Sequence, residues 1–506
     1  MWFRRGLWAA GVLTACGAVS AEVTYTKDVA PIINANCVQC HRPGQMAPMS
    51  LTSYDEVRPW AKKVREMVSE KKMPPWHAVQ HVGTFVNDRS LTDDEIATVI
   101  SWIDQGAPRG KPRDMPAAPE YPDGEWTLGE PDMVITLAPK EIPADGPDVF
   151  DRIPGKAALP EDRWISAVEI LPGDKRVVHH VIVYQIHGFD FDPQGGWMGA
   201  WAAGTDPMVF PEGTGRMLGK GANLIGDMHW HPCGEAVTDQ TRIGLHFAKD
   251  NKVEKELVNL WIAAYDFLIP AGHPNYQVRS QFTFPQDAFV LGFAPHMHFR
   301  GKDFTYTAHY PDGRSEQLLR VENYDFNWQT NYVLDEGVPM PKGTTIECVA
   351  HFDNSADNPV NPDPTRDVPF ANESYDEMMI GFVDYVVADG VRPKSADELR
   401  AEYRETMLAA HPGEVWGLYT KDKVNPAPFY LPRQGDGKIV LRVNGSITEL
   451  GVYDIVWNGN DFTSRVPLGE IGDCTLNGTL DPATGDLNAT LAGPHDINVA
   501  FKGYRL

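Results

Sequence analysis

The sequence predicts a mainly-β protein of several domains that opens with a small all-α domain. Near the N-terminus, apolar residues recur at the spacing of amphipathic helices. From about residue 126 onward, short β-prone runs alternate with turns rich in Pro, Gly and Asp, as in antiparallel β-sandwiches. The length of 506 residues suits about three or four domains. We therefore expect an all-α domain, two consecutive antiparallel β-sandwiches and a small β tail.

The charge balance limits the classes of partner. The chain has 45 Lys and Arg against 69 Asp and Glu, a formal net charge of -24 at pH 7. Such an excess of negative charge argues against nucleic acid and against an anionic membrane surface as partners. The hydrophobic content of 42% is enough for real cores, so a disordered chain is not expected.

Residues 1–21 are predicted to be a signal peptide. Arg4 and Arg5 form a positive segment, residues 7–15 are a short apolar run, and residues 19–21 offer a small-residue cleavage site. The run is too short to span a membrane. The sequence around Cys16 also resembles a bacterial lipoprotein signal, in which Cys16 would carry a lipid anchor. We expect a periplasmic or secreted protein with no transmembrane segment. Whether Cys16 carries a lipid anchor stays open.

An exported protein meets an oxidising compartment, which permits disulfides. Beyond the signal and one close pair of cysteines, the chain holds Cys233, Cys348 and Cys474. A disulfide among these three is expected. Because three is an odd number, at least one of them is free or pairs elsewhere.

The segment Cys37-Val38-Gln39-Cys40-His41 has the spacing of a c-type haem attachment site. Two thiols add to the vinyl groups of the haem, and the adjacent His41 binds the iron. A redox C-x-x-C pair or half of a zinc site is the competing interpretation. The histidine that follows directly, the exported context and the helical run before the motif favour haem.

A c-type haem calls for a second axial ligand, and we choose Met73. The prolines at 74 and 75 would hold this methionine on a loop rather than in a helix. Met46, Met49 and His77 are the rival ligands.

Residues 22–112 therefore form the predicted all-α domain. Helices are expected over 57–70 and 93–105, the second opened by a capping-box-like start. The segment 25–32, the haem motif and the later Met-Pro-Pro-Trp resemble the cytochrome c domains found at the front of modular bacterial secreted enzymes. Residues 113–125, rich in Pro, Gly and charge, are the expected linker.

The two expected sandwiches span 126–265 and 266–392. Their histidines gather in a few places. His179 and His180 are adjacent in a β-prone run, so both can face one metal only at a bulge or a strand end. His296 and His298 are two residues apart, so in a strand they share a face. Taken singly, each group is explained as ordinary buried histidines.

Two further motifs complete the series: Met-His-Trp-His at 228–231 and Asp-Glu-Met-Met at 376–379. Taken together and in order, the four motifs resemble the copper type II, ascorbate-dependent monooxygenases, the family of the peptidylglycine α-amidating and dopamine β-hydroxylating enzymes. The resemblance covers roughly residues 125–390. It implies two jelly-roll-like β-sandwiches with one copper ion each, here fused to an N-terminal cytochrome c domain.

The resemblance also assigns the ligands. The first copper takes His179, His180 and His229. The second takes His296, His298 and Met378. His229 is preferred to His231 because the family ligand is the first histidine of such a strand, and Met378 to Met379 because the family motif reads acid-Met. Spacing alone fits zinc or iron as well.

In the family, the methionine-containing copper activates O2 and hydroxylates a substrate C–H, while the histidine-only copper delivers the second electron across a solvent-filled gap. A thioether favours Cu(I), in line with that role. The resemblance thus makes His296, His298 and Met378 the catalytic ligands. Haem c would be an entry port for electrons from an external periplasmic carrier.

Two departures from the family bear on the substrate. The peptide-amidating members grip a carboxylate with an arginine and a tyrosine, and this chain has Ala294 and Phe382 there. A neutral or apolar small molecule is therefore expected as substrate, together with O2. Cys233, near the first histidine motif in sequence, is either half of a disulfide or an extra soft ligand.

Two other functions stay open. A copper oxidase or dehydrogenase would send substrate electrons out through the haem. A non-catalytic electron-transfer or copper-binding protein would have the fold of the family without its catalytic activity. For the C-terminal region, we expect a helix and linker over 393–424, with the helix at 395–409, and a small β domain over 425–506 with Asn-Gly and Asp-Gly turns.

Overall fold

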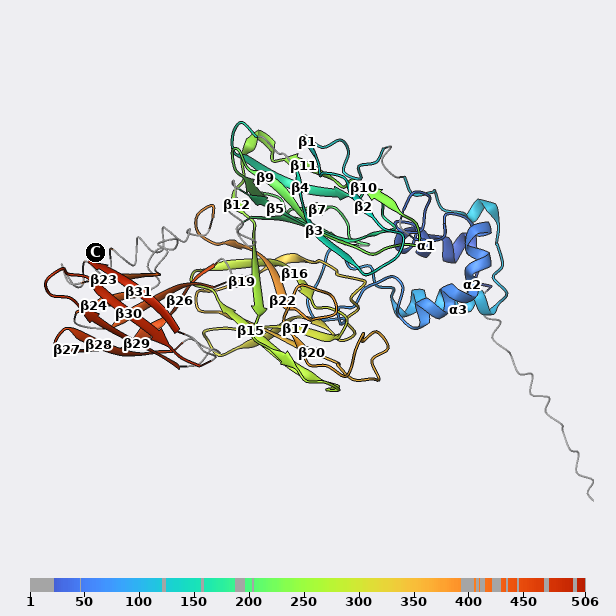
Figure 1. Cartoon of the computed structure of the whole chain (residues 1–506). Helices are drawn as coiled ribbons and strands as arrows, with labels where there is room; N and C mark the ends of the chain where they lie inside the picture. The colour runs from blue at the N-terminus through green and yellow to red at the C-terminus, as the bar shows by residue number, and fades with distance from the viewer. Residues whose placement is uncertain are drawn as a thin grey trace, which may run out of the picture. The chain divides into compact units, whose positions relative to one another are not determined.

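The structure is a computed structural model of the chain. It describes residues 22–392 except 46, 121–123, 156–158, 187–195 and 203, and then 405, 409, 415–420, 429–433, 436–443, 446–467, 473–494 and 498–505. The protein is mainly β, with several antiparallel sheets and a few N-terminal helices (Figure 1). One compact unit is Met1–Trp76 with Arg89–Glu120, and the other is His77–Asp88 with Tyr121–Leu506.

The first unit is helical. Its elements are η1 (Tyr25–Val29), α1 (Ala30–Asn36), α2 (Tyr54–Ser69), α3 (Asp93–Asp104) and η2 (Pro112–Asp114). The helices expected over 57–70 and 93–105 are present, and α2 begins three residues earlier than expected. Its N-cap Ser53 accepts a hydrogen bond from the backbone of Glu56. At α3, Thr92 and Glu95 form the complete capping box.

Residues 77–88 belong to the second unit, whereas the sequence pattern predicted that they lie within the all-α domain. They lie along the edge strands of two different β-sheets: Ala78 bridges Val321, and Phe85 bridges Leu334. These pairings lie far apart in sequence, so the local pattern of this segment gave no sign of them. We call residues 77–88 the strap.

The second unit begins with two facing sheets. One runs β1-β11-β4-β8-β12, with β7 paired to β4, and the other runs β3-β9-β5-β6. A small β10-β2 ladder lies beside them. All pairs are antiparallel except β12 with β8. The bounds are β1 (Met133–Thr136), β2 (Lys140–Ile142), β3 (Val149–Gly155), β4 (Arg163–Leu171), β5 (Val178–Ile186), β6 (Trp197–Ala202), β7 (Met208–Val209), β8 (Thr214–Leu218), β9 (Asn223–Trp230), β10 (Val237–Asp239), β11 (Arg242–Phe247), η3 (Lys249–Asn251) and β12 (Lys255–Glu256).

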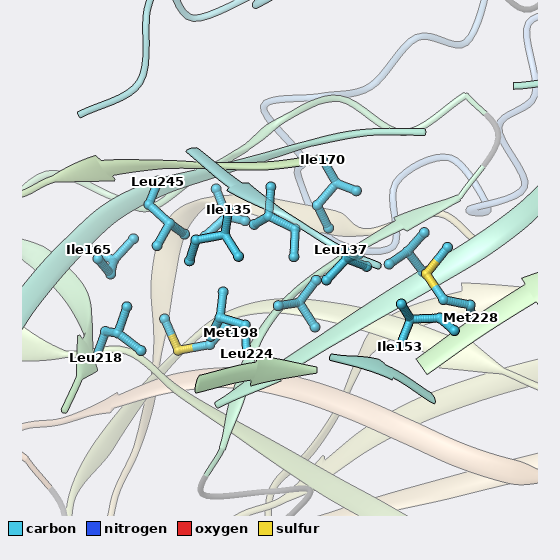
Figure 2. Packing of buried hydrophobic residues seen from close by; sticks show 14 of the residues in the cluster. Ile135, Leu137, Ile153, Ile165, Ile170, Met198, Leu218, Leu224, Met228 and Leu245 are labelled. Carbon is cyan, nitrogen blue, oxygen red and sulfur yellow. The ribbon is translucent and has the colours of Figure 1, made fainter. Parts of the chain in front are cut away.

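A hydrophobic core fills the space between these sheets. Inward side chains of the first sheet, such as Ile135, Ile165 and Leu245, meet those of the second, such as Leu224 and Met228 (Figure 2). Alternating burial along β9 puts every second residue into this core. The core thus fixes β5 and β9, the two strands that carry the first histidine motifs.

Two more sheets follow, β13-β22-β16-β19 and β15-β20-β17-β18, with a short β14-β21 pair. All their pairings are antiparallel. The bounds are β13 (Val258–Ala264), β14 (Leu268–Ile269), β15 (Tyr276–Thr283), β16 (Ala288–His296), β17 (Gly301–His309), β18 (Ser315–Val321), β19 (Tyr332–Met340), β20 (Thr345–Phe352), β21 (Val368–Pro369) and β22 (Met379–Val387).

A buried ion pair joins the two sets of sheets. Arg216 on β8 lies 2.8 Å from Asp384 on β22 and donates a second hydrogen bond to the carbonyl of Leu257. Its guanidinium also lies 4.3 Å from the ring centre of Trp197. Breaking such a pair on one side leaves an uncompensated buried charge, so this contact holds the sheets in a fixed relation.

The C-terminal region forms a 9-stranded antiparallel sheet in the order β26-β25-β24-β23-β31-β30-β29-β28-β27. It begins at Val415, inside the segment expected to be helix and linker. The bounds are β23 (Val415–Thr420), β24 (Phe429–Pro432), β25 (Gly437–Val443), β26 (Ser446–Tyr453), β27 (Ile455–Asn458), β28 (Asp461–Pro467), β29 (Asp473–Leu480), β30 (Leu487–Ala492) and β31 (Asn498–Arg505). The strands therefore begin before residue 425, where the β tail was predicted to start.

Several predictions fall outside the described residues. These are the signal peptide over 1–21 with Cys16, the rival haem ligand Met46, and nearly all of the helix over 395–409. In the part of the chain that the structure describes, no helix has the length and apolar character needed to cross a membrane.

Candidate metal centre

A β-bulge lets the two adjacent histidines of β5 face the same way. Val178 pairs with Trp230 and His180 with His229, so the register shifts at His179. This is the irregularity that a His-His doublet needs in order to serve one metal ion. The two Nδ1 atoms lie 3.2 Å apart.

His229 on β9 completes a group of three histidines. Its Nε2 donates to Asp148 at 2.7 Å, and its Nδ1 is buried without a hydrogen-bond partner. Asp148 directly precedes β3 and also bonds His231. Burial opposes ionisation of Asp148, but hydrogen bonds from the two histidines outweigh it and lower the pKa of the carboxyl. An orphaned nitrogen in a buried place is what a metal ligand presents before the metal binds.

The ligand atoms of His179, His180 and His229 all lie within 4.8 Å of one another. Burial and the neighbouring imidazoles lower the pKa of His179 to about 3, and that of His180 lies well below its usual value. The imidazoles of His179 and His180 are therefore suited to donate lone pairs at neutral pH. Three imidazole nitrogen donors fit copper, zinc or iron.

The second pair lies where β16 ends. His296 is the last residue of β16, and its Nδ1 bonds Gln329 Oε1 at 2.7 Å. His298 Nδ1 bonds the carbonyl of Asp376 at 3.2 Å. In both rings the hydrogen bond occupies Nδ1 and leaves Nε2 available to a metal. Burial lowers the pKa of His296 to about 4 and that of His298 to about 3.

The predicted methionine, Met378, directly precedes the strand that pairs with β16. His296 pairs with Ile380 across β16 and β22. The pairing ends there, because β16 ends at His296 and β22 begins at Met379, so His298 and Met378 lie in the segments just beyond these two strand ends. Met379, the rival, is fully buried in the sheet and pairs with Ala264. The choice of Met378 over Met379 as ligand stays a prediction.

The buried carboxyl group of Glu377 holds the chain after His298. Glu377 accepts hydrogen bonds from the backbone of His298 at 2.8 Å and of Arg300 at 2.6 Å. Burial raises the pKa of Glu377 to about 8 against these hydrogen bonds and the nearby Arg300. The Arg300 guanidinium is in turn bonded to Asn354 and to the carbonyl of Tyr375. This network fixes the positions of His298 and of the residue after Glu377, which is Met378.

The two histidine groups adjoin each other. The ring centres of His180 and His296 are 6.5 Å apart. Phe326 stacks on His179 at 4.8 Å and lies 5.8 Å from His298. The solvent-filled gap that the family resemblance implied is therefore not the arrangement of these residues. Side chains from both sets of sheets meet here instead.

An apolar wall stands beside His296. Ala294 and Phe382, the two positions that depart from the peptide-amidating enzymes, pair directly across β16 and β22. The Phe382 ring lies 6.2 Å from that of His296 and 5.2 Å from that of Trp261. This wall offers apolar contact and has no group at these two positions to bind a carboxylate.

In the first unit, the haem motif follows α1 directly. The backbone of His41 donates to the carbonyl of Cys37 at 2.9 Å, which puts these residues one turn apart. His41 Nδ1 bonds the carbonyl of Met49 at 3.2 Å, leaving Nε2 for an iron. Burial lowers the pKa of His41. Met73 lies just after α2, its backbone bonded to that of Met67.

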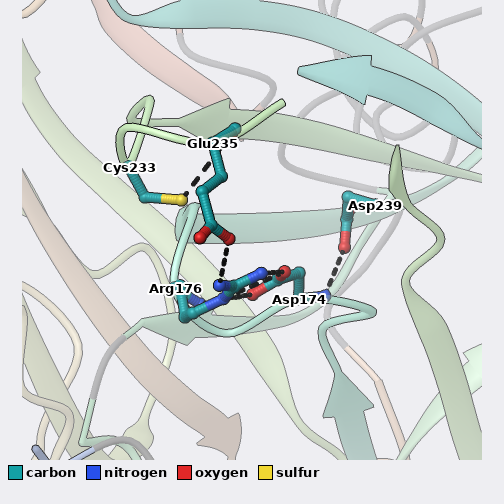
Figure 3. Close-up of polar contacts among 5 residues, drawn as sticks. All are labelled: Asp174, Arg176, Cys233, Glu235 and Asp239. Atoms are coloured by element: carbon teal, nitrogen blue, oxygen red, sulfur yellow. Dashed lines mark hydrogen bonds and ion pairs between the residues drawn. The ribbon is translucent and has the colours of Figure 1, made fainter. Parts of the chain in front are cut away.

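The cysteines do not follow the expectation of a disulfide. Cys233, Cys348 and Cys474 are free thiols, the last two buried. Cys233 is exposed, and its sulfur contacts the carbonyl of Glu235 at 3.9 Å, where Arg176 joins Glu235 and Asp174 (Figure 3). It is not in the group formed by His179, His180 and His229. The extra soft ligand considered from the sequence is therefore not brought to this group.

Sequence reasoning missed the residues that orient the histidines. Asp148 lies in a turn segment with no motif, and Gln329 and Phe326 lie in the connection between β18 and β19. No spacing rule links these positions to the histidine motifs. Only the pairing of Phe150 with His229, which the tertiary fold creates, carries Asp148 to its place.

No family model matches the sequence, and no curated protein matches it. Among solved structures, one of the infectious bursal disease virus Gx strain is 10% identical, with 51% of this chain and 73% of that chain covered and a TM-score of 0.17. A VP2 subviral particle of that virus is 10% identical, with 55% and 87% covered and a TM-score of 0.15. Similarity at this level carries no argument about fold or function.

Proposed function

We propose that the chain is an exported haem- and copper-dependent monooxygenase that hydroxylates a small organic substrate with O2. In this proposal, residues 126–265 and 266–392 are the two jelly-roll-like copper sandwiches of the copper type II, ascorbate-dependent family, preceded by a cytochrome c domain. The observation that carries it is the proximity of two histidine groups, one with three nitrogen donors and the other formed by His296 and His298.

The donor sets fit copper in two roles. His179, His180 and His229 offer only imidazole nitrogen, which suits both Cu(II) and Cu(I). His296 and His298 would take the thioether of Met378 as their third donor, and a soft sulfur donor favours Cu(I). When bound, the copper ions would supply one-electron redox chemistry and activation of O2.

The protein's own part is to hold these donors in place. Asp148 fixes His229, and Gln329 fixes His296, each through the ring nitrogen that faces away from the proposed metal. Their hydrogen bonds choose the tautomer and the ring orientation. The aromatic rings of Phe326 and Phe382 lie beside His179 and His296 and would limit the access of water, which would strengthen electrostatic interactions there.

The haem site would admit electrons. Cys37 and Cys40 would form the thioether links, with His41 and Met73 as axial ligands of the iron. A haem on the same chain has a high effective concentration toward the copper groups, which an independent carrier lacks. An external periplasmic carrier is the proposed electron donor.

The substrate is proposed to be neutral and apolar. The wall formed by Ala294, Phe382 and Trp261 offers van der Waals contact beside His296. An anionic substrate such as a peptide carboxylate would lose its hydration there without gaining a charged partner at these positions.

The proposal is tested by supplying 18O2 and a reductant to the copper- and haem-loaded protein with a panel of small apolar and aromatic compounds. We expect one labelled oxygen atom in the product, and loss of product in Met378→Leu and His296→Ala. His309→Ala, a change at a half-exposed histidine of β17, serves as control. Oxidised product without labelled oxygen would point to the oxidase or dehydrogenase, and copper binding without turnover of any compound to an electron-transfer protein.

A further inference from the structure

The connection between β18 and β19 reaches three parts of the histidine cluster. We call residues 322–331 the bridging loop. Its Tyr324 hydroxyl bonds both the backbone nitrogen and the carbonyl of Met297, at 3.0 and 2.7 Å. Met297 lies between His296 and His298, so one side chain of the loop is hydrogen-bonded to the backbone between two proposed ligands.

Two other side chains of the bridging loop contact imidazoles. Gln329 bonds His296, and its amide nitrogen also donates to the carbonyl of Phe326 at 3.4 Å. Phe326 is buried and stacks on His179 with an interplanar angle of 19°. The position of this one loop therefore determines the surroundings of histidines in both groups.

The strap, residues 77–88, holds the bridging loop at both ends. At the β18 end, the backbone of Val79 donates to the carbonyl of Arg320 at 2.8 Å. At the β19 end, Asn87 bonds on both sides of Tyr332: its Nδ2 donates to the carbonyl of Asn331 at 2.6 Å, and its Oδ1 accepts from the backbone of Val333 at 3.0 Å.

Close packing accompanies these hydrogen bonds. Phe85 packs on Tyr332 with ring centres 5.5 Å apart, and both side chains are buried. Gly83 has φ +74, and a Cβ there would lie 2.7 Å from the carbonyl oxygen of Leu318. Only glycine allows the strap to approach β18 this closely.

We infer that the strap is a positioning element that keeps the bridging loop closed on the histidine cluster and thereby sets how tightly and in what geometry the cluster binds metal. The part of the inference that concerns metal binding rests on the proposed function. The part that concerns the position of the bridging loop rests on the contacts described above. The strap also follows Met73 by four residues in the sequence, so the proposed haem ligand and the element that orders the copper ligands share one stretch of chain.

Asn87→Ala is the main test, because it removes two hydrogen bonds and leaves the backbone of the strap unchanged. Val86→Ala is its control: the side chain is exposed, and its backbone hydrogen bond to Val333 remains. Losing two bonds should raise hydrogen exchange of residues 322–331 in the metal-free protein by about ten- to thirtyfold, with no such change in the control.

Gly83→Ala is the second test, with Gly313→Ala as its matched control. Gly313 has φ +89 and open space around it, so both variants share the backbone strain and only Gly83→Ala adds a collision. If Gly83→Ala fails to fold, Asn87→Ala and Phe85→Leu still decide whether the strap holds the bridging loop. In copper-loaded protein, Asn87→Ala and Gly83→Ala should change the Cu(II) paramagnetic resonance spectrum and speed copper loss to a chelator, by about tenfold.

Two outcomes separate this inference from the proposed function. Wild-type protein that takes up no copper would end the proposed function, while the exchange measurement would still decide whether the strap holds the loop. The inference alone would be overturned if the wild type binds copper while Asn87→Ala and Gly83→Ala leave the hydrogen exchange of the bridging loop and the copper spectrum unchanged. The proposed function would then still stand.

Discussion

The imidazole rings of His180 and His296 lie 6.5 Å apart at an interplanar angle of 89°, although they belong to different sheets. One proposed ligand of each metal is thus next to a ligand of the other. Arg216 and Asp384 clamp the same two sets of sheets together through a buried ion pair. The packing of the two sets of sheets within the second unit therefore brings the two histidine groups together.

Two Cu(II) ions bound to these groups should interact magnetically. Because His180 and His296 adjoin, we expect the paramagnetic resonance spectrum of fully loaded protein to be broadened by spin–spin interaction. His296→Ala, loaded at the first group alone, should give a sharp, isolated Cu(II) signal. A fully loaded spectrum equal to the sum of two isolated signals would contradict the close arrangement.

Asp148→Ala should weaken copper binding by the first group about 10- to 100-fold, because the carboxylate fixes the tautomer and orientation of His229. His231→Ala is the control, since His231 contacts the same carboxylate but its side chain is 70% exposed. Competition titration with a chelator measures both. Equal affinities in Asp148→Ala and wild type would exclude the orienting role.

Met378→Leu should lower Cu(I) affinity at the second group and leave Cu(II) binding nearly unchanged, because sulfur prefers the softer ion. Met379→Leu changes a buried methionine to an aliphatic side chain of similar size and should cost less than about 1.5 kcal/mol of stability without altering Cu(I) affinity. Cu(I) titrations of the two variants compare them directly. If Met379→Leu loses Cu(I) and Met378→Leu does not, the assignment is reversed.

Glu256 gives a prediction on pH and stability. Burial raises the pKa of this carboxyl, against the lowering effects of Arg392 and Arg216. In the folded state Glu256 keeps its proton to higher pH than in the unfolded chain, so its contribution to stability falls as pH rises above about 4.5. Glu256→Gln should therefore gain stability relative to wild type between pH 4.5 and 7, measured by urea unfolding. A constant difference across that range would show that Glu256 is not buried as described.

The sequence anticipated the features that rest on local pattern. The helices α2 and α3 follow apolar periodicity, and the capping box of Thr92 and Glu95 is readable from their spacing. A bulge or a strand end was predicted at His179 and His180, because adjacent histidines need one of these to face one ligand, and the structure has the bulge. The β-rich remainder follows from alternating runs between turns.

The features that depend on distant pairing could not be predicted. Asp148 and Gln329 reach their histidines only through the packing of separate strands and loops. The strap pairs with strands more than 200 residues later in the chain, and its local sequence carries no strand pattern. The approach of His180 to His296 likewise depends on how two sets of sheets pack, which no motif encodes.

The most direct test of the account is the metal content of the purified, exported protein, measured together with its optical spectrum. We predict one c-type haem and two copper ions per chain, with one copper lost in His296→Ala and haem attachment lost in Cys37→Ala. Haem accompanied by zinc, or by no second metal, would contradict the copper monooxygenase and leave a cytochrome joined to a β-sheet module.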